Sequence, residues 1–273
     1  MTSFSDPKYL REKQYRTTKN LNARVSLHQR FRTNPYPWHR WVFDQIQEPD
    51  FAKIFEIGCG PAYLWAENLE RIPESWSIHL LDLSLGMVTA ARDSLKNREF
   101  SYLAGDAQDI PAETNKFDAV IANHMLFHIP DLERALSNIR RILKPGGRLY
   151  ATTNGFRNLI EIWEWAAQAL TSRNDIPTSR KSVLNFSLEN GEELLLRYFS
   201  SIALTQYPDS LEINEAPPIV DFVVSSSMQI ELDEAELLTY LNFLEHKLTV
   251  DKVLKVTKNM CIFCGRIIRF PKS

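Results

Sequence analysis

The sequence predicts an α/β fold in which helices cover both faces of a doubly wound, mostly parallel sheet. From residue 51 onward, short apolar runs alternate with amphipathic stretches, which is typical of parallel strands joined by helices. A tight glycine turn follows the first apolar run, and Lys144-Pro145-Gly146-Gly147 separates a helical stretch from a later run. These three observations predict the fold class before any single side chain is interpreted.

The elements of the core follow from this pattern in chain order. Apolar runs predict strands at 52–57, 76–82, 100–104, 117–123 and 147–153. Amphipathic stretches between them predict helices near 62–71, 85–96 and 132–143. We therefore expect a ligand-binding core over residues 49–155.

Residues 1–48 predict an N-terminal helical extension or lid over this core. Apolar residues from Leu21 to Phe31 recur at helical spacing, and Asn34-Pro35-Tyr36-Pro37 then breaks the helix. A second apolar stripe begins at Trp38 and predicts another helix.

The chain after the core predicts a cap and the completion of the sheet. Residues 156–200 are expected to form a helical cap insertion, and the predicted elements in it are a helix near 156–171, a polar loop at 172–183 and a helix near 188–199. Residues 201–273 should complete the core sheet around a helical insertion, and the predicted elements are strands at 201–207 and 260–270 and a helix pair at 217–249. We expect the cap to cover the carboxyl edge of the sheet, where open α/β sheets bind ligands.

Composition limits the classes of function. The chain has 273 residues, of which 44% are hydrophobic, so it can bury a full-sized core. The net charge of −2 supplies no field that would attract a polyanion, and this disfavours nucleic acid as a partner. The first residues, MTSFSDPKYLREK, lack the pattern of a signal peptide, and no apolar run approaches the roughly 18 residues of a membrane span. We therefore expect a cytoplasmic protein.

The cysteine pattern agrees with this compartment. Three cysteines, Cys59, Cys261 and Cys264, are an odd and widely separated set, unlike the disulfide framework of a small secreted protein. Cys261 and Cys264 form a CxxC motif, but no second Cys/His pair at metal-ligand spacing accompanies it. We interpret them as core thiols in a strand and predict no metal site.

A glycine turn after the first predicted strand gives the sharpest local signal. In Phe55-Glu56-Ile57-Gly58-Cys59-Gly60-Pro61-Ala62, an acidic residue near the end of a strand precedes two glycines that let the backbone approach a ligand. A dinucleotide-binding GxGxxG motif would need a third small residue at position 63, where this chain has Tyr63. Hydride chemistry with NAD is therefore disfavoured.

Two further acids follow the next two predicted strands. Asp82 lies about two dozen residues after the glycine turn, where a carboxylate can hold the ribose hydroxyls of an adenosine. Asp106, in Gly105-Asp106-Ala107, can accept a hydrogen bond from the adenine amino group. Taken singly, such acids are more often helix caps or turn residues. Together with Glu56, they follow three successive strands and predict an adenosine-binding edge.

In this combination the chain resembles the class I S-adenosylmethionine-dependent methyltransferases over roughly residues 50–155. The resemblance implies a seven-stranded, Rossmann-like sheet and S-adenosylmethionine as the cofactor. Leu143-Lys144-Pro145-Gly146-Gly147 looks like the family's segment before the fifth strand. The residues that the resemblance assigns to the cofactor are Glu56, Gly58, Cys59, Gly60, Asp82, Leu83, Asp106, Ala107 and Asn123.

The segment after the fourth strand indicates the type of acceptor. Asn123-His124-Met125-Leu126-Phe127-His128 resembles the motif of members that methylate small molecules, including those in quinone biosynthesis. Relatives that methylate nucleic-acid bases carry Asn/Asp-Pro-Pro-Tyr/Phe here, and Asn34-Pro35-Tyr36-Pro37 does not substitute for it because it precedes the core. Ala62 replaces the third glycine of many members, and we expect only a slight shift of the turn.

The implied reaction is an in-line methyl transfer, for which the protein must align the acceptor and exclude water. His124 directly follows the fourth predicted strand, so it is the predicted base or acceptor-orienting residue. The alternative role is a histidine that steadies the loop. His128, one helical turn further on, is expected to pack or cap.

Acceptor selection is expected to fall to the N-terminal helices and the cap. The aromatic candidates for lining an acceptor pocket are Tyr15, Trp38, Trp41, Phe156, Trp163 and Trp165, although the spacing of Trp38 and Trp41 also fits a core stripe. Arg24 or Arg30 is a candidate for the cofactor's carboxylate.

Two other functions stay open at this point. One is the transfer of an aminopropyl group from decarboxylated S-adenosylmethionine, although the paired acids used for a polyamine are not evident. The other is a non-catalytic cofactor-binding subunit, which would need a partner. The sequence does not identify the acceptor, the methylated atom or the oligomeric state.

Overall fold

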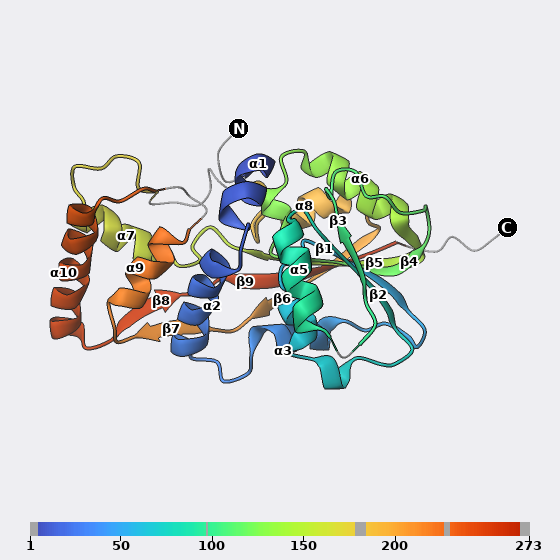
Figure 1. Ribbon diagram of the computed structural model, residues 1–273, viewed down its shortest axis with the longest axis horizontal. Helices are drawn as coiled ribbons and strands as arrows, with labels where there is room; N and C mark the ends of the chain where they lie inside the picture. Colours follow the sequence, from blue (N-terminus) through green and yellow to red (C-terminus); the bar gives the residue numbers. More distant parts are fainter. Residues whose placement is uncertain (1–4, 97, 178–183, 227–229, 268–273) are drawn as a thin grey trace.

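Seven strands form one sheet at the centre of the larger part of the molecule (Figure 1). The computed structural model describes residues 5–96, 98–177, 184–226 and 230–267. In chain order the strands of this sheet are β1 (Lys53–Ile57), β2 (Ser77–Asp82), β3 (Ser101–Ala104), β4 (Phe117–Asn123), β5 (Leu143–Asn154), β6 (Ser201–Tyr207) and β9 (Met260–Arg266). All seven predicted strands are present, and residues 268–270 of the last prediction lie outside the described residues.

The order of the strands in space is β3-β2-β1-β4-β5-β9-β6. Strands β1 to β5 pair in parallel, and β9 runs antiparallel to both β5 and β6. The chain reverses its direction of winding between β1 and β4, which are neighbours in the sheet. Open α/β sheets bind ligands at the carboxyl ends of strands around such a switch point. The predicted α/β, mostly parallel fold class is confirmed.

Helices cover both faces of this sheet because side chains alternate along the buried strands. One face packs against α3 (Trp38–Gln45), α4 (Tyr63–Ala66) and α5 (Leu85–Ser94), and the other packs against α6 (Leu132–Ile142) and α8 (Gly191–Leu196). Cys261 packs on the α6 face and Cys264 on the α3 face, so the two thiols of the CxxC motif point to opposite sides of β9. Among the described residues, no group of three or more His, Cys, Asp or Glu side chains is arranged to hold a metal.

The sequence explains where two of these helices begin. Asp131 accepts a hydrogen bond from the backbone N–H of Arg134 at 3.0 Å and caps α6, whose buried residues recur at helical spacing. Ser84 caps α5 in the same way through the backbone N–H of Met87. The predicted helix at 62–71 is interrupted: α4 ends at Ala66, and a 3₁₀ turn follows at Leu69–Arg71. The side chain of Asn68 donates to the carbonyl of Leu64 at 2.7 Å, a local bond that competes with helix continuation.

A smaller part of the molecule forms a second hydrophobic core beside the carboxyl edge of the main sheet. It contains α7 (Ile160–Ala169), α9 (Pro217–Val224), α10 (Glu234–Asp251) and an antiparallel pair of strands, β7 (Ser210–Ile213) and β8 (Leu254–Thr257). Figure 1 shows these elements together at the left, with α2 (Lys19–Phe31) between them and the main sheet. The two-stranded sheet was not predicted, because each strand has four residues and its partner lies about forty residues away.

The cap differs from its prediction at one helix. We expected residues 156–200 to form the cap, but only α7 joins the second core, whereas Leu195 of α8 is buried against the main sheet. The predicted helix at 156–171 begins later, at Ile160, after Leu159 adopts a left-handed conformation with a φ of +58°. Residues 178–183 of the predicted loop lie outside the described residues. None of the described helices has the length and apolar character needed to cross a membrane.

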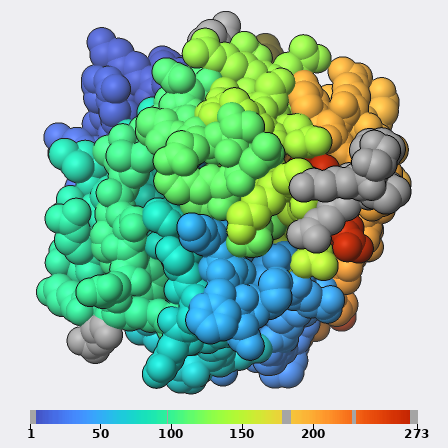
Figure 2. Space-filling model, turned by 90° about the vertical axis from the view of Figure 1, so that its right-hand side faces the viewer, coloured from blue at the N-terminus to red at the C-terminus, as the bar shows by residue number. Residues whose placement is uncertain are grey.

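The N-terminal segment reaches around the core. After α1 (Pro7–Tyr9) and a π-helical turn at Leu10–Gln14, α2 lies against the second core through Leu27 and Phe31. Residues of α3 then return to the main sheet. Figure 2, which views the end of the molecule away from the cap, shows dark-blue N-terminal residues at the upper left and lighter blue residues at the bottom. The expected helical extension therefore bridges the two cores.

Candidate cofactor and acceptor site

One cavity brings all ten predicted site residues together. Its volume is about 370 Å³, and its lining includes Glu56, Gly58, Cys59, Gly60, Asp82, Leu83, Asp106, Ala107, Asn123 and His124. These residues come from the carboxyl ends of β1, β2 and β4 and from the loop after β3, because parallel strands end at the same edge of the sheet. The cavity extends from this edge to α2 and to residues near the second core.

The turn after β1 needs small residues because its backbone is left-handed and crowded. Gly58 has a φ of +64° and Gly60 a φ of +55°. A Cβ atom at Gly58 would lie 2.7 Å from the Cβ of Met125, closer than side chains can approach. Ala62 is buried and also left-handed, with a φ of +62°. This conformation explains why glycine suits the position, and alanine, the smallest alternative, occupies it here.

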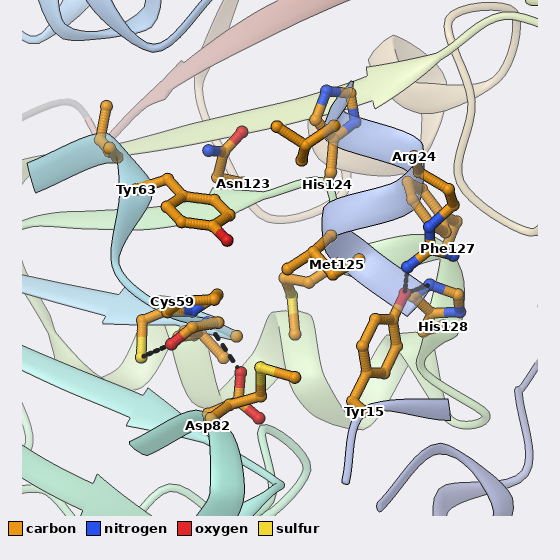
Figure 3. Close-up of a pocket in the computed structure, with 18 of the residues that line it drawn as sticks. Tyr15, Arg24, Cys59, Tyr63, Asp82, Asn123, His124, Met125, Phe127 and His128 are labelled. Carbon is orange, nitrogen blue, oxygen red and sulfur yellow. Dashed lines mark hydrogen bonds between the residues drawn. The ribbon is translucent and has the colours of Figure 1, made fainter. Parts of the chain in front are cut away.

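Two carboxyls line the cavity: Glu56, which is buried, and Asp82, which is half-buried and is labelled in Figure 3. Asp82 accepts the backbone N–H groups of Gly60 at 2.9 Å and Ser84 at 2.8 Å. Burial nevertheless raises the pKa of Asp82 to about 6. Glu56 is 1% exposed, and burial raises its pKa to about 8, although the indole N–H of Trp65 donates to it.

The raised pKa values of Glu56 and Asp82 indicate what kind of ligand the site suits. A buried carboxyl with a raised pKa has fewer donors and positive charges around it than its ionised form needs. Ribose hydroxyls and the positive charges of S-adenosylmethionine would supply both. The residues present therefore fit this cofactor.

Asp106 and Cys59 complete the predicted cofactor residues near the turn. The carboxylate of Asp106 accepts the backbone N–H of Gln108 at 2.8 Å, so the turn after β3 is held by its own acid. Burial raises the pKa of the Cys59 thiol well above its usual range, so this side chain stays neutral. Its backbone N–H donates to Leu81, which ties the glycine turn to β2.

Asn123 and His124 are held at the end of β4 by Thr152 of the neighbouring strand β5. The Thr152 hydroxyl accepts the backbone N–H of His124 at 2.9 Å and donates to Asn123 Oδ1 at 2.6 Å. His124 has a φ of +52°, an uncommon conformation for a residue with a side chain. Its ring packs on Trp38, with centroids 5.0 Å apart. Strained residues of this kind concentrate at functional sites.

A second histidine also reaches the cavity. His128 Nε2 lies 3.1 Å from the hydroxyl of Tyr15, and Arg24 donates to the same hydroxyl at 3.3 Å. All three residues line the cavity (Figure 3). We expected His128 to pack or cap, and its ring does pack on Phe127, but it also belongs to a polar group that faces the ligand space.

The structure separates the other predicted acceptor and carboxylate residues. Tyr15, Trp38 and Arg24 line the cavity. Arg30 is exposed and pairs with Glu215 at 2.7 Å, so it is not available to the cofactor. The remaining aromatic candidates lie in the packed cores: Trp41, Phe156, Trp163 and Trp165.

Sequence reasoning missed four polar residues of the cavity wall. These are His28, Arg32, Tyr207 and Lys258. The spacing Arg24, His28, Arg32 places these side chains on one side of α2 and could have indicated two of them. Tyr207 and Lys258 carry no local signal, because their positions depend on how β6 and β8 end.

Comparisons with known proteins agree with this geometry. Residues 55–151 match the family model described as "Methyltransferase domain". The chain is 29% identical over 116 residues to the ubiquinone/menaquinone biosynthesis C-methyltransferase UbiE of Idiomarina loihiensis, covering 41% of this chain and 46% of that protein. It is 34% identical over 131 residues to the biotin biosynthesis bifunctional protein BioHC of Saccharophagus degradans, covering 47% of this chain and 22% of that protein. The match thus spans less than half the length of these curated relatives.

A solved structure extends the likeness to the whole fold. The phosphoethanolamine N-methyltransferase 2 of Haemonchus contortus, in complex with S-adenosyl-L-methionine, superposes with a TM-score of 0.57 at 18% identity. The match covers 99% of this chain and 61% of that protein. Residues 55–151 therefore match a methyltransferase domain, and the fold of the whole chain is that of S-adenosylmethionine-dependent methyltransferases. The family match, the fold class and the cofactor of these relatives agree with what the sequence predicted.

Proposed function

We propose that this methyltransferase transfers a methyl group from S-adenosylmethionine to a small-molecule acceptor by in-line displacement. One observation carries the proposal: the ten residues predicted from the cofactor and post-β4 motifs line a single cavity, which continues beyond them to Tyr15, Trp38 and Tyr207. A cavity of about 370 Å³ with aromatic and polar walls suits a small ligand rather than a flat macromolecular surface.

In this proposal the strand-end acids hold the cofactor. Asp82 accepts from the ribose hydroxyls, Asp106 from the adenine amino group, and Arg24 pairs with the methionine carboxylate. Gly58 and Gly60 let the backbone approach, as a Cβ at Gly58 would collide with Met125. The bound cofactor supplies an activated methyl group, so the protein's main task is to align the acceptor and exclude water.

His124 is the proposed base or orienting residue for the acceptor. From the end of β4, with its left-handed backbone, the His124 ring packs against Trp38, and both residues line the cavity. An imidazole ordinarily titrates near neutral pH, so it can take a proton from the acceptor's hydroxyl, amine or acidic carbon. Tyr15 and His128 form a second candidate for this proton, because their side chains share a 3.1 Å contact in the same cavity.

The flanking segments would select the acceptor. Residues 1–48 contribute α2 and Trp38 to the cavity, and residues 201–273 contribute Tyr207 and Lys258. We propose the cytoplasm as the compartment, because three cysteines, an odd and widely separated set, do not fit a disulfide framework. The relatives named above act in quinone and biotin biosynthesis by their names, and small acceptors of that kind are consistent with the cavity.

Calorimetry followed by product analysis tests the proposal. We expect S-adenosylmethionine and S-adenosylhomocysteine to bind the purified protein and NAD not to bind. We then expect a metabolite extract incubated with protein and methyl-labelled cofactor to yield a product heavier by one labelled methyl group. At a cofactor concentration near the wild-type Kd, the Asp82→Asn variant should yield much less of it. Binding without any labelled product would favour a non-catalytic subunit, and absence of binding would contradict the proposal.

A further inference from the structure

Part of the cavity wall contains cationic and donor side chains that the methyl-transfer chemistry does not use. We name Arg32, Trp38, Tyr207 and Lys258 the anion subsite. These residues come from the end of α2, the start of α3, the end of β6 and the turn after β8, so four distant segments meet here.

Lys258 is the most buried charge of the anion subsite. Its side chain is 3% exposed, and its ammonium pairs with Asp209. An ammonium has three N–H donors. Among the described residues, Asp209 is the one acceptor that the structure gives to Lys258 Nζ, so this group can donate to a ligand as well.

Asp209 is already well supplied with donors. Its Oδ1 accepts backbone N–H groups from Thr33 at 3.1 Å, Asn34 at 2.9 Å and Ser210 at 2.9 Å. The carboxylate therefore does not depend on Lys258 alone. Because it pairs with Lys258, it fixes the ammonium at the cavity wall before a ligand binds.

Arg32 adds a second positive charge. Within the described ranges, no carboxylate lies within ion-pair distance of its guanidinium, in contrast to Arg30 on the same helix, which pairs with Glu215. Burial lowers the pKa of Lys258, and the charge of Arg32 lowers it further, against the effect of Asp209. Burial also raises the pKa of Tyr207 to about 12, and Arg32 opposes that rise. Arg32 therefore lies close enough to both residues to act on them electrostatically.

Aromatic rings connect these charges to the proposed reacting centre. The Tyr207 ring lies 5.4 Å from Lys258 Nζ and 5.2 Å from the Trp38 ring, and Trp38 in turn packs on His124. The indole N–H of Trp38 is buried and has no hydrogen-bond acceptor among the described residues. Glu67 also lines the cavity and is paired with His39 at 2.7 Å; burial raises its pKa, but His39 and the more weakly acting Arg32 hold that pKa below its usual value.

We propose that the methyl acceptor carries an oxyanion, a carboxylate or a phosphate, that binds Arg32 and Lys258 while an apolar or aromatic body packs on Trp38 and Tyr207. Hydrogen bonds between charged groups and an oxyanion are short and strong. The buried ammonium of Lys258 and the planar guanidinium of Arg32 therefore favour an anionic ligand over a neutral or cationic one. The inference rests on the proposed function and specifies its substrate class.

Matched probes test the charge preference directly. Phenylacetate, phenyl phosphate, phenylacetamide and 2-phenylethylamine are titrated into protein saturated with S-adenosylhomocysteine, and affinity is measured by calorimetry. The test variant is Arg32→Gln, and the matched control is Arg30→Gln, two residues away on the same helical segment and outside the cavity.

We expect phenylacetate or phenyl phosphate to bind the wild type at least about tenfold more tightly than the amide and the amine. The better of the two anions identifies carboxylate or phosphate as the recognised group. Arg32→Gln should remove most of this preference while S-adenosylhomocysteine affinity stays unchanged, and Arg30→Gln should keep the preference.

Two results would overturn the inference. One is that neither anion binds the wild type more tightly than the amide and the amine do. The other is that Arg32→Gln keeps the preference for the anions. The wild-type comparison alone decides the first point, so the test does not depend on how well the variant folds. Failure of S-adenosylhomocysteine to bind would instead contradict the proposed function itself, whereas its binding without an anion preference would contradict only the substrate class.

Discussion

Replacing Glu56 by glutamine should stabilise the ligand-free protein in a pH-dependent way. Glu56 is 1% exposed, and burial raises its pKa from the usual 4.5 to about 8, with a smaller contribution from Asp82. A carboxyl whose pKa is raised on folding stabilises the fold below the unfolded-state value, and this stability is lost as pH rises toward the folded-state value. The relevant window is therefore pH 4.5 to about 8.

The magnitude follows from the same two values. At pH 7 the unfolded state gains about 3 kcal/mol from ionising Glu56, whereas the folded state keeps the carboxyl largely protonated and gains almost nothing. Glutamine cannot ionise, and its amide oxygen can still accept the N–H of Trp65. Glu56→Gln should thus be more stable than the wild type by about 3 kcal/mol at pH 7 and by well under 1 kcal/mol at pH 4.5.

Urea denaturation followed by tryptophan fluorescence at several pH values measures this difference. Comparing variant and wild type at each pH cancels the titration of all other groups. Glu70→Gln is the matched control, because Glu70 is exposed on the surface and should give no comparable gain. A stability difference that does not change between pH 4.5 and 7 would refute the reasoning. With saturating S-adenosylmethionine, the wild type should gain more stability than the variant, because an ionised Glu56 suits a positively charged ligand.

Three other perturbations test separate parts of the site. Asp82→Asn should weaken S-adenosylhomocysteine binding by about 10- to 100-fold in calorimetry, through loss of charge-assisted hydrogen bonds, and an unchanged affinity would defeat the ribose assignment. His124→Ala should keep S-adenosylhomocysteine affinity and lower the yield of methylated product. If His128→Ala lowers that yield and His124→Ala does not, the role of base belongs to the Tyr15–His128 pair. Gly58→Ala should abolish cofactor binding and lower the free energy of unfolding by about 1–3 kcal/mol, because its Cβ would collide with Met125 in a left-handed turn; a thermal melt equal to that of the wild type would show that the turn tolerates the methyl group.

The main sheet was predictable because its signals are local. Apolar runs such as 117–123 are buried on both faces and match the observed strand from end to end. The β7–β8 pair was not predictable, since four-residue strands far apart in sequence have no periodicity and become stable only through a tertiary pairing. The placement of α8 on the main sheet also depends on packing, here of Leu195 and Phe199 against β9 and its neighbours.

The proposed cofactor side of the site was more predictable than the proposed acceptor side. Each proposed cofactor residue lies at or just after the carboxyl end of a strand, and the sheet topology alone brings those ends together. Acceptor-side residues meet through α2 and the second core, so the sequence could not distinguish Arg24, which lines the cavity, from Arg30, which pairs with Glu215 on the surface. Trp163 and Trp165 were ambiguous for the same reason, because an aromatic stripe on a helix fits both a pocket and a core.

A crystal structure with S-adenosylhomocysteine is the most direct measurement of the central claim. We predict the ribose hydroxyls about 3 Å from the Asp82 carboxylate, the adenine amino group at Asp106 and the sulfur facing the part of the cavity that His124 and Trp38 line. A nucleoside bound outside this cavity, or an Asp82 carboxylate that contacts no ribose oxygen, would contradict the account.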